Sequence, residues 1–440
     1  MSALAELFVR RGVKVTGCDA NATGVEDLRQ LGIKITQGHD PSHISGVRAL
    51  VITSAMPKSH PELEQARAAG IPVVRRAEAL GEATSGDGRD LIGIAGTHGK
   101  STTTVMTAEA LAAAGRDPTA LVGARVTNWH GNFRPGSDRL YVVEADEYDR
   151  SFLAMSPTVA VVTNVEADHL DIYADLADIR GAFGQFIREA RTIVLCDDDA
   201  GASTLATPSA SEVIRYGIVS RDARLRALSV RTEPTGAGFA VEYDGELLGS
   251  VALKVTGTHN VLNALAAIGA GLTIGAPFAG LAYGLGNFVG AARRFERVGD
   301  VAGITVIDDY AHHPTEISAT LSAARSSFPN RRIVVAFQPH LYSRTRDFAR
   351  EFACALSASD AVYLADIYAA REKPIPGISA DLIVDALGPE QRKLVWRGER
   401  SALAAALARD SREGDVVITM GAGDVTKTGP ELLARLRAAP

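Results

Sequence analysis

A glycine-rich loop with a lysine and a serine is the part of this sequence whose chemistry is clearest. The loop follows the apolar run from Leu91 to Ala95 and precedes an alanine-rich helical segment. It consists of Gly96, Thr97, His98, Gly99, Lys100, Ser101 and Thr102. Such a loop binds phosphate through backbone amides and its lysine, and the serine binds magnesium. We therefore expect ATP and Mg²⁺ here rather than a glycine turn with a chance lysine, although Ile94 stands where the general pattern has a glycine.

Acidic residues follow the two strands expected next along the chain. The run YVVEADEYD contains Glu144, Asp146, Glu147 and Asp149, and VAVVTNV leads into Glu166, Asp168 and His169. Open α/β sheets bind ligands at the carboxyl ends of their strands, and oxygen ligands suit magnesium. Taken alone, each cluster would be interpreted as a solvated loop, because acidic residues are mostly exposed. After a phosphate-binding loop, the two clusters favour a metal site.

Short β-branched runs alternate with alanine- and leucine-rich segments along the chain, which predicts parallel α/β sheets. Three blocks are expected: residues 1–88, 89–296 and 297–440. The polar segment from 81 to 90 is interpreted as the linker between the first two. Alternating polar and apolar residues within 213–256 suggest a small antiparallel insertion.

Composition excludes several classes of function. Lys and Arg number 46 against 52 Asp and Glu, so the formal charge of −6 offers no broad attraction for nucleic acid. The sequence has no apolar run long enough for a membrane span. Cys18, Cys196 and Cys354 are scattered without metal-ligand spacing, which favours a reduced, cytoplasmic location. The oligomeric state does not follow from the sequence.

The chain resembles the Mur ligase superfamily, and within it the branch that adds L-alanine to UDP-N-acetylmuramate. The resemblance rests on eight motifs in the family's order: GTHGKST, EADEYDRSFL, TNVEADHLD, GTHNVLNALAA, ARRFERVG, DDYAHHPTE, FQPHLYSRTRDF and DIYAAREKPIPG. It implies a Rossmann-like UDP-binding domain, a central P-loop ATPase-type α/β domain and a C-terminal Rossmann-like α/β domain. The small-molecule substrates UDP-N-acetylmuramate and L-alanine are the partners that it implies.

The resemblance also implies roles around the nucleotide. Lys100 would hold the β- and γ-phosphates and take part in catalysis. The implied magnesium ligands are Ser101, Glu144 and His169. The implied adenine, phosphate and ribose contacts are His259, Asn260, Asn263, Arg294 and Asp309. Without the family context, Asn260 would be interpreted as a helix cap.

Further residues are implied for the substrates. Asp19 and Ser54 would contact the sugar nucleotide. The incoming amino acid and the sugar carboxylate would be held by His340, Arg344 and Arg346, together with His169. Guanidinium groups suit this role because they bind carboxylates bidentately. The implied catalytic residues are Lys100, His169, Arg344 and His313, although the adjacent pair His312 and His313 is equally compatible with capping a helix end.

Two departures from the wider family matter. Ligases that act later in the pathway carry a carbamylated lysine about fifteen residues past the histidine that matches His169, and Phe183 or its neighbours occupy that stretch here. This favours the alanine-adding branch. The chain also begins inside the family's first glycine-rich loop, so we expect the first strand of the first domain to be missing. The alternatives are that a later strand takes its place or that this member dispenses with it.

The reaction implied by the resemblance is the ATP-dependent formation of an amide through an acyl-phosphate, the first peptide step of peptidoglycan precursor synthesis. One alternative is the recycling ligase that attaches a tripeptide to the same sugar nucleotide. An alternative from another class is a P-loop nucleotide switch or motor. The FQPHLYSRTRDF and AREKPIPG segments favour the alanine-adding enzyme over the recycling ligase, and the FQPH and HHPTE segments weigh against a switch or motor.

Overall fold

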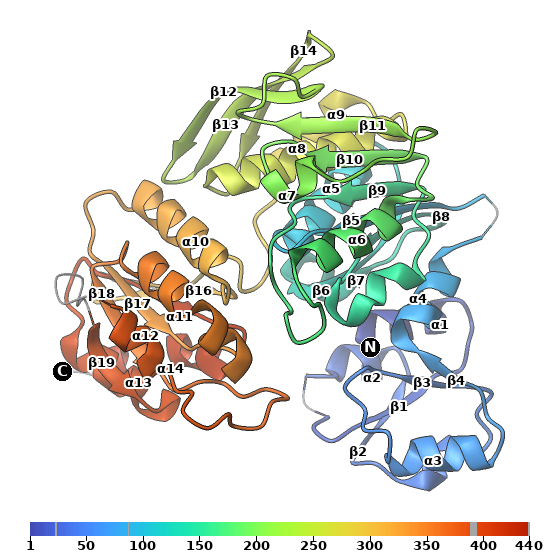
Figure 1. Cartoon of the computed structure of the whole chain (residues 1–440), viewed down its shortest axis with the longest axis horizontal. Coiled ribbons are helices and arrows are strands. Elements are labelled where there is room, and N and C mark those ends of the chain that lie inside the picture. Colours follow the sequence, from blue (N-terminus) through green and yellow to red (C-terminus); the bar gives the residue numbers. More distant parts are fainter. Residues whose placement is uncertain (23, 87, 388–393, 439–440) are drawn as a thin grey trace.

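The chain folds into three α/β units, which Figure 1 shows in blue, in cyan to yellow and in orange to red. The computed structural model describes residues 1–22, 24–86, 88–387 and 394–438. Within these residues, no helix combines the length and the apolar character that crossing a membrane requires.

The N-terminal unit has two small parallel sheets. Its elements are α1 (Ser2–Arg10), β1 (Thr16–Asp19), α2 (Glu26–Gln30), β2 (Lys34–Gln37), η1 (Pro41–Ile44), β3 (Leu50–Ile52), α3 (Pro61–Ala68), β4 (Val73–Arg75) and α4 (Arg76–Thr84). Strand β1 pairs with β2, and β3 pairs with β4, but no ladder joins the two pairs within the described residues. In the part of the chain that the structure describes, no later strand pairs between them, which disfavours one alternative considered for this sheet.

The expected linker is shorter than predicted. Helix α4 continues through the first part of 81–90, and its residues Leu80, Ala83 and Thr84 are buried. Gly81 is a packing position, because a Cβ there would lie 2.0 Å from the backbone oxygen of Ala154. Together with α1, helix α4 joins the hydrophobic core of the central unit. The helix and the next strand leave only residues 85–89 between them, and Asp87 lies outside the described residues.

The central unit is built on a ten-stranded sheet with the order β14-β13-β12-β11-β10-β9-β5-β8-β6-β7. Its strands are β5 (Asp90–Ala95), β6 (Pro118–Val126), β7 (Gly131–Arg134), β8 (Ser137–Glu144), β9 (Val159–Val162), β10 (Thr192–Cys196), β11 (Glu212–Gly217), β12 (Leu225–Glu233), β13 (Gly236–Tyr243) and β14 (Glu246–Leu253). Its helices are α5 (Lys100–Ala113), η2 (Thr127–Trp129), η3 (Tyr148–Ala154), α6 (Leu176–Ile187), α7 (Ala200–Ser203), α8 (Thr258–Thr273) and α9 (Phe278–Asn287). The expected antiparallel insertion is the meander β12–β14, which extends this sheet.

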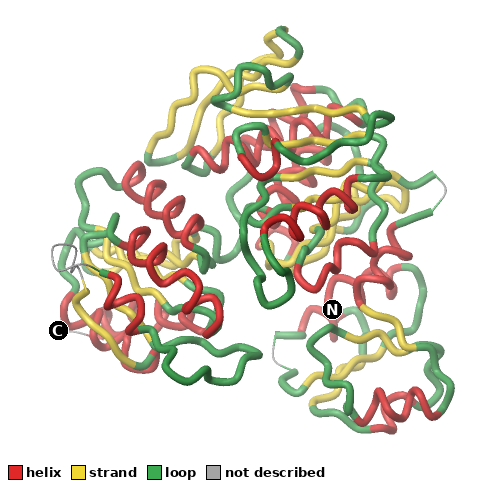
Figure 2. Tube along the Cα trace, in the orientation of Figure 1, coloured by secondary structure: helices red, strands yellow, loops and turns green. Residues whose placement is uncertain are grey.

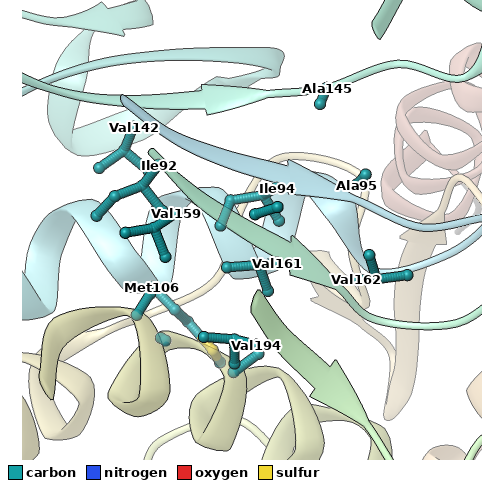
Figure 3. Packing of buried hydrophobic residues seen from close by; sticks show 14 of the residues in the cluster. Ile92, Ile94, Ala95, Met106, Val142, Ala145, Val159, Val161, Val162 and Val194 are labelled. Carbon is teal, nitrogen blue, oxygen red and sulfur yellow. The ribbon is translucent and has the colours of Figure 1, made fainter. Parts of the chain in front are cut away.

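Apolar runs in the middle of this sheet are buried on both faces, as parallel strands under helices are. Figure 3 shows Ile92, Val161 and Val194, which come from the adjacent strands β5, β9 and β10, packed near Met106 of α5. On the opposite face of β5, a Cβ on Gly93 would lie 2.9 Å from the ring of Phe186 in α6. Helices α5 and α6 therefore pack on opposite faces of β5, the strand from which the glycine-rich loop begins.

The C-terminal unit has a six-stranded sheet with helices on both faces (Figure 2). The strand order is β15-β16-β20-β17-β18-β19. The elements are β15 (Glu296–Val301), β16 (Ile304–Asp309), α10 (Pro314–Ser327), β17 (Ile333–Phe337), α11 (Tyr342–Leu356), β18 (Ala361–Ala365), α12 (Asp381–Ala386), β19 (Leu394–Gly398), α13 (Arg400–Asp410), β20 (Val416–Met420), η5 (Asp424–Lys427) and α14 (Thr428–Ala438). Only β15 runs antiparallel, to β16. Helices α10, α11 and α12 cover one face, and α13 and α14 cover the other.

Phe183 illustrates how the core excludes polar groups beside the site. It is fully buried in α6, and its ring packs edge-on against Phe152 with centroids 5.1 Å apart. The stretch in which related ligases carry a carbamylated lysine is thus apolar at this position.

Replacing Phe183 with alanine should lower the free energy of unfolding by about 3–5 kcal/mol, because a large cavity remains in a close-packed core. Urea unfolding followed by circular dichroism measures this. Tyr283→Ala is the matched aromatic control, since this side chain is 70% exposed and should change stability by no more than about 0.5 kcal/mol. Equal effects of the two variants would contradict the packing described here.

Candidate active site

The loop between β5 and α5 depends on two glycines. Gly99 has a φ of +80°, and a Cβ there would lie 2.7 Å from Oδ1 of Asn263. Gly96 has a φ of +144°, and a Cβ there would lie 1.9 Å from Oγ1 of Thr163. Both positions require glycine because of their backbone conformation and the closeness of the neighbouring side chains. The loop leads directly into the N-terminus of α5, which is the arrangement of a phosphate-binding site.

The Lys100 ammonium group lies inside the loop. Its Nζ lies 2.7 Å from Oε2 of Glu147 and donates to the backbone oxygens of Gly96 and Thr97 at 2.6 and 3.1 Å. Burial disfavours its charge, but the nearby carboxylates, Glu147 first, outweigh burial and raise the pKa of Lys100. Lys100 is therefore a protonated, preplaced cation, and Glu147, expected only as a member of an acidic cluster near a metal, is its ion-pair partner.

The three expected magnesium ligands lie around this loop. Ser101 Oγ donates to both carboxylate oxygens of Glu144 at 3.0 Å, and Glu144 also accepts from the amide of Gly123 at 2.6 Å. His169 Nε2 lies 3.6 Å from Oε1 of Glu147, and its buried Nδ1 has no hydrogen-bond partner among the described residues. Burial lowers the pKa of His169 to about 4, so its ring is neutral at neutral pH. Carboxylate and hydroxyl oxygens with a free imidazole nitrogen fit a divalent cation.

The central and C-terminal units meet through a buried ion pair between Asp168 and Arg344. Both residues are close to fully buried, at 5% and 4% exposed. Burial opposes the charge of Asp168, but the Arg344 guanidinium and His169 hold the pKa of that carboxyl well below its usual range. A second pair, Arg371 with Asp171 at 3.1 Å, lies at the more exposed rim of the interface.

A second contact joins the phosphate loop to the start of α10. Thr315 Oγ1 donates to Oε2 of Glu166 at 2.6 Å, and Nδ1 of His98 lies 3.3 Å from Oε1 of Glu316. Burial disfavours the imidazolium, yet Glu316 and Glu166 raise the pKa of His98 to about 9. The loop histidine thus pairs with an acid of another unit, a partner that motif spacing does not indicate. The sequence had placed Glu166 in an acidic cluster, but it had not singled out Glu316.

His313 caps a helix and also lies close to the phosphate loop. It is the N-cap of α10, where its Nδ1 accepts from the amide of Thr315 at 3.4 Å in a capping box with Glu316. Its ring also lies 4.8 Å from the ring of His98. Burial, with His98 next, lowers the pKa of His313 to about 4, so its ring is neutral. Capping therefore places His313 beside the phosphate loop.

The structure separates the two arginines of α11. Arg344 NH1 lies 3.4 Å from Nδ1 of His340, inside the interface. Arg346 is exposed and its Nε donates to Asp347 at 2.7 Å. Residues two apart on a helix point in different directions, so only one of the two can face the central unit. His340 stacks on Tyr368 with centroids 5.9 Å apart, and burial lowers the pKa of His340 to about 3.

A cavity of about 770 Å³ opens between the loop, the start of α8 and the C-terminal unit. Its walls include His98, Gly99, His259, Asn263, Arg294 and Asp309. This size lies within the range of nucleotide-sized ligand sites. The cavity brings together the residues expected to bind adenine, phosphate and ribose, although they come from two units.

Polar side chains in this cavity are held in place by hydrogen bonds to backbone groups and to Thr103. Asn263 Oδ1 accepts from Oγ1 of Thr103 at 3.1 Å, and the side chain of Asn260 donates to the oxygen of Thr256 at 2.8 Å. Asn260 lies inside α8, whose N-cap is Gly257, so it is not the cap. Asp309 accepts from two backbone amides at 2.7 Å, and burial raises its pKa to about 6.

Asp19 and Ser54 lie elsewhere, in the N-terminal unit. Asp19 ends β1 and accepts from the amide of Asn21 at 2.8 Å, and Ser54 follows β3. Both are exposed, and neither lines the cavity. The structure therefore brings the expected nucleotide residues together and places Arg344 and His340 at the same interface, whereas Arg346 is exposed and the expected sugar-nucleotide residues lie in another unit.

Removing the Arg344 side chain should destabilise the protein by about 3–5 kcal/mol, because Asp168 would remain buried without its counter-ion. Arg346→Ala, two residues along the same helix, should cost no more than about 1 kcal/mol, since its ion pair is exposed. Urea midpoints of the two variants measure the difference. The double variant Arg344→Ala/Asp168→Asn should recover part of the loss, and strict additivity would contradict a direct coupling.

Comparison with known proteins agrees with this architecture. Three family models match in order: "Mur ligase family, catalytic domain" over residues 1–87, "Mur ligase middle domain" over 94–271 and "Mur ligase, glutamate ligase domain" over 293–423. The UDP-N-acetylmuramate–L-alanine ligase of Acidothermus cellulolyticus is 46% identical, over 99% of this chain and 93% of that protein. The enzyme of the same name from Salinibacter ruber is 42% identical, over 97% and 90%.

Solved structures give the same result. The UDP-N-acetylmuramate-alanine ligase of Thermotoga maritima superposes with a TM-score of 0.84 at 28% identity, covering 100% of this chain and 97% of that one. A murein peptide ligase from Psychrobacter arcticus gives a TM-score of 0.74 at 25% identity, with the same coverage. With matches to all three domain models and relatives above 40% identity along nearly its whole length, the chain belongs to the Mur ligase family.

Proposed function

We propose that this protein is an ATP-dependent ligase that joins L-alanine to the lactyl carboxylate of UDP-N-acetylmuramate. The observation that carries the proposal is the contact of Arg344, beside His340, with Asp168 of the unit that carries the phosphate loop, in a chain with nearly full-length relatives of that activity. A nucleotide switch does not need a carboxylate-binding group opposite its phosphate loop. The tripeptide-adding alternative is less well supported, since the murein peptide ligase superposes less closely than the alanine ligase.

The reaction must first convert a carboxylate into an acyl donor. A free carboxylate would have to expel oxide when an amine attacks, whereas an acyl-phosphate expels phosphate. Lys100, at the N-terminus of α5, would neutralise negative charge on the transferring γ-phosphoryl group. Its contact with Glu147 keeps Nζ in position before the nucleotide binds.

The metal site would be formed by Ser101, Glu144 and His169. Mg²⁺ bound there would shield the charge of the phosphates. The neutral ring of His169 keeps its buried Nδ1 available as a ligand. Ser101 and Glu144 already orient each other through their hydrogen bonds.

The remaining roles follow from position. Arg344 would hold a substrate carboxylate, because its guanidinium has donors beyond the one that contacts Asp168. Asn263, Arg294 and Asp309, which line the cavity, would contact the nucleotide, and His340, beside Arg344, would contact the amino acid. We place Asp19 and Ser54 at the sugar nucleotide, which would bind to the N-terminal unit. Arg346 is the weakest candidate because it is exposed and paired with Asp347.

Release of phosphate from ATP should require both UDP-N-acetylmuramate and an amino acid, with L-alanine preferred over glycine, L-serine and a tripeptide. The physical reason is that the acyl-phosphate is consumed only when an amine attacks it. A coupled phosphate assay over this panel, with mass spectrometry of the product, measures both specificity and bond formation. ATP hydrolysis that is indifferent to both substrates would instead support a switch or motor.

The Glu144→Gln variant should need at least about tenfold more Mg²⁺ for half-maximal activity, because a neutral amide binds a hard cation more weakly than a carboxylate does. A magnesium titration at saturating ATP measures this. The matched control is Glu189→Gln, whose side chain is 70% exposed and remote from the loop. A Glu144→Gln titration curve that coincides with the control would remove Glu144 from the metal site.

A further inference from the structure

A second group of metal-binding side chains lies in the N-terminal unit, away from the nucleotide cavity. Cys18 is on β1, His39 follows β2, and Glu62 is in the first turn of α3. Cys18 Sγ lies 3.4 Å from Nδ1 of His39 and 3.1 Å from each carboxylate oxygen of Glu62. His39 Nδ1 lies 3.9 Å from Oε2 of Glu62. A thiol, an imidazole and a carboxylate from three separate segments therefore lie within 4.8 Å of one another.

These separations match the edges of a metal coordination sphere. In a tetrahedral zinc site, bond lengths of about 2.0–2.3 Å to nitrogen, oxygen and sulfur place neighbouring ligand atoms roughly 3.3–3.6 Å apart. The three pairs of atoms in this cluster bracket that range. Small side-chain rotations would therefore bring all three ligands to bonding distance of one ion.

The charge balance of the cluster also points to a cation. Glu62 is 1% exposed, and its ion-pair partners among the described residues are two histidines, His39 and His43. A buried carboxylate is costly unless a positive charge compensates it. His43 Nδ1 lies 2.8 Å from Oε1 of Glu62, so it is placed to support the carboxylate or to complete the coordination.

An unpaired imidazole nitrogen is the independent observation. His60, the N-cap residue of α3, packs edge-on against His39 with ring centroids 4.6 Å apart. Its Nδ1 is buried and has no hydrogen-bond partner among the described residues. A buried imidazole nitrogen without a partner thus lies on the ring that packs against the proposed ligand His39.

We propose that Cys18, His39 and Glu62 form a binding site for a thiophilic divalent cation of the Zn²⁺ class. Soft sulfur and imidazole ligands select such a metal over Mg²⁺, which prefers oxygen. The Cys18 thiol loses its proton to solvent when the metal binds, and the ion then ties β1, the loop after β2 and the start of α3 together. The bound ion stabilises a unit whose strands form only two-stranded sheets.

Cobalt provides the test, because a cobalt–thiolate bond absorbs in the near ultraviolet and oxygen-bound cobalt does not. The full chain, reduced and freed of metal by a chelator, is titrated with Co²⁺ while excess Mg²⁺ occupies oxygen-rich sites. We expect one equivalent of Co²⁺ to produce a thiolate charge-transfer band, and Zn²⁺ to abolish it stoichiometrically. A titration without such a band overturns the proposal.

Variants identify the ligands. Cys18→Ser should lose the band, whereas Cys354→Ser, which removes an exposed free cysteine, should keep it. His39 is exposed, so His39→Gln should preserve the fold, as circular dichroism verifies, and weaken Co²⁺ binding by at least about tenfold. A band that persists in Cys18→Ser, or His39→Gln binding as tight as the parent's, would also overturn the assignment.

Discussion

The active-site arrangement depends on one buried charge contact, between Asp168 of the central unit and Arg344 of the C-terminal unit. Burying either charge alone would cost free energy, so the buried charge of each unit is compensated by the opposite charge of the other. The contact has little freedom because the surrounding side chains exclude water. It sets where the start of α11 lies relative to the phosphate loop, and therefore where a substrate carboxylate would meet the terminal phosphate.

Next to this contact lies a series of ionisable groups of the central unit. Lys100 pairs with Glu147, Glu147 lies 3.6 Å from His169, and His169 lies beside Asp168, which pairs with Arg344. Burial keeps His169 neutral in this series, and Arg344 and Lys100 also lower its pKa, although the neighbouring Asp168 raises it. A neutral ring between two acids suits a metal ligand, and the separate units must be closed for the series to be complete.

The N-terminal unit is organised differently. It joins the central core through α1 and α4, whereas its strands form two separate pairs. Its buried polar cluster at Glu62 is supplied by histidines and a cysteine instead of lysine or arginine. The two regions thus use opposite solutions for a buried carboxylate: fixed ion pairs at the interface, and a set of metal-compatible ligands in the N-terminal unit.

The sequence by itself determined the α/β class, the phosphate loop and the family, because these depend on local patterns: a strand, a glycine turn and a helix start lie within a dozen residues. The same reasoning placed Lys100, Ser101 and Glu144 at one sheet edge, since parallel strands end together. The sequence wrongly predicted a linker over the end of α4. Its Gly81 resembles a linker glycine, but it is needed for close packing of the helix.

Only the tertiary structure decided which charges meet. Glu166 with Thr315, His98 with Glu316 and Asp168 with Arg344 are separated by about 150 to 220 residues in the chain, and spacing carries no information about them. It also separated Arg344 from Arg346, because a helix turns neighbouring side chains to different sides. Three cysteines that looked scattered in the sequence include one, Cys18, that folding brings against His39 and Glu62. The physical reason is that electrostatic and ligand-binding partners are chosen by distance in space, which the packing of whole units sets.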